Sequence, residues 1–111
     1  MTTDINMEQL QKDAVEIFNQ GFACSESLIY AIRKNFDLDM SDDAIAMSSG
    51  FPWGLGGGGC ICGALAGATM MIGYFFGRTT PGDPKINKCF ALTNELHDFF
   101  KEYCGATCCR V

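Results

Sequence analysis

The sequence is poor in histidine and in positive charge. Its 111 residues include one histidine, His97, and eight Lys and Arg against 13 Asp and Glu, which gives a formal net charge of −5. With one histidine, no Ser-His-Asp set has supporting spacing, and any zinc site would rely almost wholly on thiolates. The acidic balance makes nucleic acid and anionic membrane surfaces poor partners.

The N-terminus lacks the pattern of a secretory signal. No basic region followed by an apolar stretch occurs at the start of the chain. We therefore expect a cytoplasmic protein in a reducing compartment, where structural disulfides are uncommon. Seven cysteines are unusual in that setting, and an odd number cannot all pair within one chain. Thiols in this number indicate redox work or metal ligation.

Strand patterns are also absent, and helical periodicity accounts for most of the chain. We expect an all-α fold, a small bundle of about five helices forming a single domain over residues 1–111. The predicted helices are Asp4–Asn19, Cys24–Asn35, Ser41–Ser49, Gly63–Phe76 and Lys85–Tyr103. The last helix carries an apolar stripe at helical spacing, formed by Cys89, Leu92, Leu96, Phe99 and Tyr103.

No charged residue lies between Asp43 and Arg78. Because the apolar run in this interval is short and broken by glycine, no membrane span is expected. We expect instead a central helix, buried on all sides, around which the other helices pack. Gly63 and Gly67 lie one turn apart on this helix and would let neighbouring helices approach closely.

A glycine-rich segment, Gly50–Gly59, precedes that helix. We predict a loop without regular structure, because each glycine loses much backbone freedom on ordering. Gly54–Gly59 formally matches G-x-G-x-x-G, but no strand precedes it, so a dinucleotide site is not expected. Trp53 is predicted to anchor the loop by packing. His97 is predicted to be a solvated surface residue.

The thiols at predicted helix starts are the strongest candidates for chemistry. Cys62 lies between the glycine-rich segment and a helix, and Cys24 opens another helix. A thiol at a helix N-terminus faces unpaired N–H groups and the positive end of the helix dipole, which favour the nucleophilic and metal-binding thiolate. The alternative for both residues is plain packing, since free cysteine is often buried. If they act together, they must be spatial neighbours.

A family signature is matched at the start of the predicted central helix, by Cys62-Gly63-Ala64-Leu65-Ala66-Gly67. This segment resembles the signature of the C_GCAxx family. Members of that family are small helical bacterial and archaeal proteins with a proposed redox role. Gly21-Phe22-Ala23-Cys24 resembles the early Gly-x-x-Cys segment of the family, and Cys109-Arg110 resembles its Cys-Arg pair. The resemblance implies a redox role, without an established substrate, for Cys24, Cys62 and Cys109.

The resemblance has one departure. Family members hold a further cysteine after the Cys-Arg pair, and the 111 residues here do not. Two expectations stay open: either Cys104 or Cys108 replaces the missing thiol, or the chain is a shortened member with altered chemistry.

Three interpretations follow. The first is a redox-active thiol protein that performs reversible thiol–disulfide exchange with a partner protein, Cys62 attacking and another thiol resolving. The second is an electron-transfer module that binds zinc or an iron–sulfur cluster, with ligands among Cys24, Cys60, Cys62, Cys108 and Cys109. The third is a structural or adaptor protein with buried cysteines. A homo-oligomer is compatible with each of them.

Overall fold

A computed structural model describes residues 5–59 and 61–107. Within these ranges it contains helices and no strand, so the predicted all-α class is confirmed. The helices are α1 (Met7–Asn19), α2 (Cys24–Phe36), α3 (Asp42–Ala46), α4 (Pro52–Leu55), α5 (Gly63–Phe76) and α6 (Lys85–Cys104). In the described ranges, no helix combines the length and the apolar character needed to cross a membrane.

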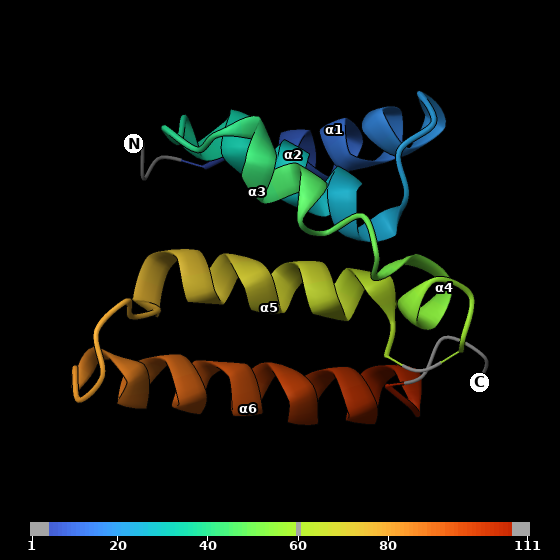
Figure 1. Cartoon of the computed structure of the whole chain (residues 1–111). Helices are drawn as coiled ribbons and strands as arrows, with labels where there is room; N and C mark the ends of the chain where they lie inside the picture. Colours follow the sequence, from blue (N-terminus) through green and yellow to red (C-terminus); the bar gives the residue numbers. More distant parts are fainter. Residues whose placement is uncertain (1–4, 60, 108–111) are drawn as a thin grey trace.

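Helix α5 is the central element. It lies between α2 and α6 (Figure 1). Helices α1 and α3 pack on other sides of α2. The prediction of a central helix is confirmed, but the expectation that it is buried on all sides is wrong. Tyr74 is 44% exposed, and many other α5 residues are half-buried, because the neighbouring helices leave part of its surface open.

Small residues set the close approach of α2 and α5. A Cβ atom built on Gly67 would lie 3.0 Å from the carbonyl oxygen of Ser25 and 3.1 Å from its Cα. Since these are backbone atoms, a side chain at position 67 would push the two helices apart. Ser25 is fully buried there, and its Oγ donates a hydrogen bond to the carbonyl of Ser48 at 2.9 Å.

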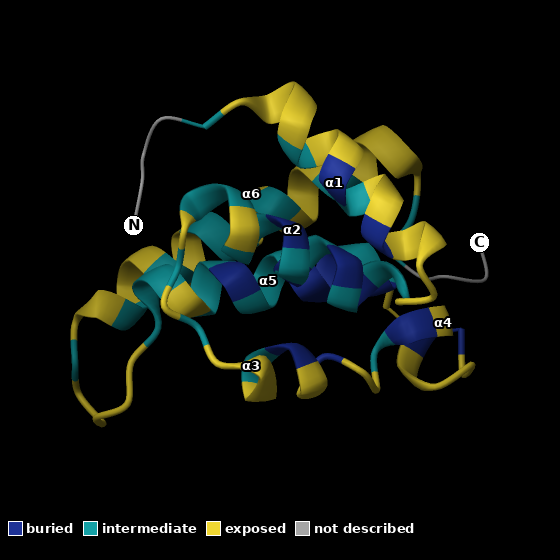
Figure 2. Cartoon of the chain, turned by 90° about the horizontal axis from the view of Figure 1, so that it is seen from above, coloured by how far each residue is buried: buried dark blue, intermediate teal, exposed yellow. Residues whose placement is uncertain are grey.

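The apolar core is small and lies along α2 and α5, where the buried residues in Figure 2 concentrate. Its buried members are Ile29, Ile45 and Met71. Half-buried side chains surround them, namely Tyr30, Ile32, Leu38, Met40, Met70 and Phe75. The core therefore joins α2, α3 and α5 and leaves α6 outside it.

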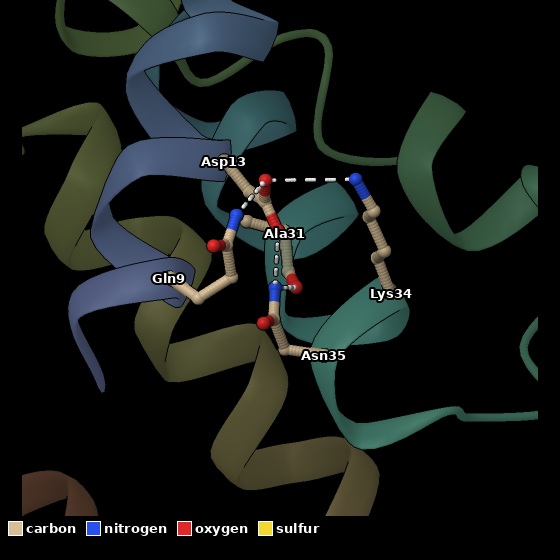
Figure 3. Close-up of polar contacts among 5 residues, drawn as sticks. All are labelled: Gln9, Asp13, Ala31, Lys34 and Asn35. Atoms are coloured by element: carbon tan, nitrogen blue, oxygen red, sulfur yellow. Dashed lines mark hydrogen bonds and ion pairs between the residues drawn. The ribbon is translucent and has the colours of Figure 1, made fainter. Parts of the chain in front are cut away.

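Helices α1 and α2 are joined by a buried carboxylate (Figure 3). Asp13 is only 3% exposed. Gln9 Nε2 and Asn35 Nδ2 each donate a hydrogen bond to it at 2.9 Å, and Lys34 Nζ lies 3.5 Å from its Oδ1. The hydrogen bond from Asn35 and then that from Gln9 lower the pKa of Asp13, because they stabilise the ionised carboxylate.

The predicted stripe of α6 is wrong at its C-terminal half. Phe99 and Tyr103 are 63% and 81% exposed. The 20 residues of α6 span about 30 Å, whereas the 14 residues of α5 span about 21 Å. Helix α6 returns antiparallel along α5 (Figure 1), which is too short to cover its whole length. The residues that face α5 are half-buried, and no residue of α6 is buried.

The glycine-rich segment contains a short element that the sequence did not predict. The N–H of Leu55 donates to the carbonyl of Phe51 at 2.9 Å, and that of Gly56 to Pro52 at 3.1 Å, which closes the single turn α4. Trp53 adopts a left-handed φ of 59° within this turn. Its side chain is 70% exposed, so the prediction that it anchors the loop is wrong. Pro52 and Gly54 are buried instead.

Candidate thiol site

The starts of α2 and α5 lie at the same end of the molecule (Figure 1). Cys24 is the first residue of α2, and Cys62 is the N-cap of α5. The sulfur of Cys24 lies against Gly63, so closely that a Cβ atom built on this glycine would collide with it. Because Gly63 is bonded directly to Cys62, the packing of α2 on α5 brings Cys24 next to the segment that carries Cys62.

The chain after α6 returns to this end. Gly105 caps α6 in the left-handed conformation with φ of 80°, which turns the chain back. The N–H of Cys62 then donates a hydrogen bond to the carbonyl of Thr107 at 2.6 Å. Three distant segments therefore meet here: the start of α2, the start of α5 and the segment that follows α6.

Glu26 ties the start of α2 to the segment before α4. Its Oε1 accepts a hydrogen bond from the N–H of Ala23 at 3.0 Å, and its Oε2 accepts one from the Ser49 hydroxyl at 2.7 Å. The carboxylate therefore satisfies an N–H group next to the helix start. It also holds the chain that leads into the glycine-rich segment near Cys24.

The predicted site residues are not all placed by the structure. Cys24 and Cys62 are free thiols and half-buried. Cys60, Cys108 and Cys109 lie outside the described residues. In the sequence, Cys108 and Cys109 directly follow Thr107, the hydrogen-bond partner of Cys62.

The two remaining cysteines lie on α6. Cys104, its last residue, is exposed, and Cys89 is half-buried near its start. They are 15 positions apart, which corresponds to about 22 Å of helix. Cys89 therefore lies toward the opposite end of the molecule from the start of α5, as expected for a packing residue.

No group of three His, Cys, Asp or Glu side chains is placed to hold a metal ion within residues 5–59 and 61–107. The ligands predicted from the sequence include Cys60, Cys108 and Cys109, which are not among those residues. Zinc and iron–sulfur sites in proteins use up to four thiolates. A zinc or iron–sulfur site here would therefore need ligands from Cys60, Cys108 or Cys109 in addition to Cys24 and Cys62.

Two apolar cavities next to the thiols were missed by the sequence analysis. One, of about 270 Å³, is lined by Cys24 together with α1 and α2 residues and by Ala64 of α5. The other, of about 320 Å³, lies between α5 and α6 and includes Ala66. The small side chains at the start of α5 were a signal for this free space, but the space itself depends on how the helices pack.

Comparison with known proteins connects this geometry to a family. Residues 22–111 match the family model described as "Putative redox-active protein (C_GCAxxG_C_C)". A protein of Archaeoglobus fulgidus, titled uncharacterized, is 31% identical over 61 residues, which cover 55% of this chain and 40% of that protein. No solved structure matches the chain. The family match covers most of the sequence and includes Cys24 and Cys62, and the chain therefore belongs to the C_GCAxxG_C_C family.

Proposed function

We propose that the protein performs reversible thiol–disulfide exchange in which Cys62 attacks and Cys24 resolves. The observation that carries this proposal is the contact of the Cys24 sulfur with Gly63, the residue after Cys62. Membership in a family described as redox-active supports the same class of chemistry. Both thiols also occupy helix starts, where reactive cysteines are commonly found.

The proposed reaction conserves atoms and electrons. The Cys62 thiolate attacks one sulfur of a partner disulfide, that S–S bond breaks, and one partner thiolate leaves. The Cys24 thiolate then attacks the Cys62 sulfur of the mixed disulfide and releases the second partner thiolate. The partner is reduced by two electrons, and the protein ends with a Cys24–Cys62 disulfide. The reverse sequence oxidises a partner dithiol.

Cys109 has a proposed role as a third thiol, with Cys108 as its neighbour. The hydrogen bond between Cys62 and Thr107 supports this role, because it brings the chain to the start of α5 just before these two cysteines. A thiol there would accept the disulfide from Cys62 in place of Cys24 or after it. Cys104, which is exposed at the end of α6, is the other candidate for this third thiol.

The test is trapping of the mixed disulfide. The protein is purified without oxygen and treated with a small aromatic disulfide, and the products are identified by mass spectrometry. We expect the wild type to lose the mass of two hydrogens reversibly and to yield a Cys24–Cys62 peptide. The Cys24→Ser variant should accumulate the reagent on Cys62, and the Cys62→Ser variant should not react in this way. Cys89→Ser is the control and should behave as the wild type.

Other outcomes would select the other interpretations. A disulfide between Cys62 and Cys109 would make Cys109 the resolving thiol. Stoichiometric zinc or iron in the anaerobically purified protein, lost in both the Cys24→Ser and the Cys62→Ser variants, would favour the metal-binding module. Thiols that react no faster than those of the unfolded chain would favour a structural role.

A further inference from the structure

The larger of the two cavities, between α5 and α6, combines apolar surface with a few hydrogen-bonding groups. Leu65, Ala66 and Met70 of α5 contribute apolar surface. Thr69 of α5 and Thr93 and His97 of α6 contribute hydrogen-bonding groups. No Asp, Glu, Lys or Arg is among the described residues that line it. Its volume of about 320 Å³ lies at the lower end of the range for small-molecule pockets.

The polar groups have unused hydrogen-bonding capacity. The Nδ1 atom of His97 pairs with Asp98 Oδ1 at 3.0 Å, which leaves Nε2 for another partner. The Thr69 hydroxyl donates to the Leu65 carbonyl at 2.8 Å, and its oxygen is still able to accept a hydrogen bond. The cavity therefore offers an apolar volume with a few hydrogen-bonding groups from both helices.

We propose that this cavity binds a small uncharged molecule with an apolar body of about one aromatic ring and one hydroxyl or carbonyl group. The apolar body would pack against Leu65 and Met70, and the polar group would pair with His97. A charged ligand is disfavoured because the cavity would remove its charge from water without supplying an opposite charge. This binding does not require that the thiols be redox-active.

The position of the cavity allows binding to be detected at the backbone amide of Cys62. Ile61 and Thr107 also line it. Thr107 accepts the hydrogen bond from the Cys62 N–H, and Ile61 directly precedes Cys62 in the chain. A molecule in the cavity would therefore change the environment of the Cys62 amide without any reaction at the sulfur.

The test uses p-cresol and toluene as probes, titrated into the full chain and followed by NMR of the backbone amides. We expect saturable shifts of Cys62, Thr93 and His97. Ala66→Leu fills the cavity and should abolish the shifts. The matched control is Ala64→Leu, the same change on the same helix at a residue that lines the other cavity, and it should retain binding of p-cresol.

Three further variants complete the test. Thr93→Leu fills the cavity from α6, which has no buried residue, and should also abolish binding if Ala66→Leu does not fold. His97→Phe should weaken p-cresol about fivefold, the typical effect of one lost hydrogen bond, and leave toluene unchanged. Cys62→Ser should bind both probes as the wild type does. Absence of saturable shifts with either probe, or undiminished binding in Ala66→Leu and Thr93→Leu, would overturn the proposal.

Discussion

At the scale of single residues, Gly63 determines where the sulfur of Cys24 is able to lie. The space that a Cβ atom would take at this position is filled by that sulfur, and the Cα of Pro52 lies 3.4 Å from the same point. Gly63 does not adopt a positive φ, so glycine is required here for space rather than for backbone freedom. The first turn of α5 is thereby coupled to the thiol of α2.

The Gly63→Ala variant tests this coupling. We expect the added methyl group to lower the free energy of unfolding by about 1–3 kcal/mol through overpacking. The cost should be smaller in a Cys24→Ala background, because the sulfur that meets the methyl group is then absent. Urea denaturation of the two single variants, the double variant and the wild type gives the coupling.

Gly73→Ala is the control for this cycle. Gly73 lies in the same helix as Gly63. Apart from its chain neighbours and the nearby backbone of that helix, no atom lies within 4 Å of a Cβ atom built on Gly73. Alanine there should therefore stabilise the protein by about 0.5–1 kcal/mol, the usual gain within a helix. Equal costs of Gly63→Ala with and without Cys24 would contradict the proposed contact.

At the scale of the helices, Asp13 makes the pairing of α1 with α2 depend on pH. Its pKa is lower in the folded protein than its ordinary value of 3.8. A lowered pKa means that the ionised carboxylate stabilises the fold. This contribution is complete above the ordinary pKa and is lost as the pH falls through the folded-state pKa.

We expect Asp13→Asn to lower the melting temperature at neutral pH, because the amide cannot carry the charge that Gln9 and Asn35 stabilise. The difference from the wild type should shrink as the pH falls below about 3.8. Thermal melts by circular dichroism between pH 3 and pH 7 measure it. The exposed Asp39 provides the control, and Asp39→Asn should follow the wild type throughout. A difference independent of pH would show that the charge of Asp13 does not stabilise the helix pair.

At the scale of the whole molecule, the helices form layers with unequal burial. Buried residues lie on α1, α2, α3, α4 and α5, whereas α6 contributes none (Figure 2). Helix α6 packs chiefly on α5, which is shorter than α6. Local stability follows the amount of buried apolar contact. Helix α6 should therefore open more readily than the rest.

Native-state hydrogen exchange measures this difference. We expect the amides of α6 to exchange through an opening of lower free energy than those of α2 and α5. The amides near Ile29 and Met71, which lie in the core, are the internal reference. Equal protection of α6 and α5 would show that the helices unfold as one cooperative unit.

Hydrophobic periodicity was enough to predict the helical class, the approximate helix bounds and the central place of α5. It was sufficient because these features depend on the pattern of apolar and polar residues along the chain. The cysteines and the Cys62–Gly67 segment likewise led to the family, which the comparison confirms. The same reasoning failed for Trp53 and Tyr103, whose apolar character predicts packing although both are exposed.

Features that depend on distant residues were decided only by the tertiary structure. Asp13 is buried because Asn35 of α2 and Gln9 of α1 pair with it, and no local pattern at position 13 requires this. The two cavities exist because the helices pack at particular distances around small side chains. Composition and spacing along the chain determined which cysteines occupy helix starts. The close packing of α2 on α5 decided that the sulfur of Cys24 meets Gly63, because contact between residues so far apart in sequence depends on the helices' relative positions.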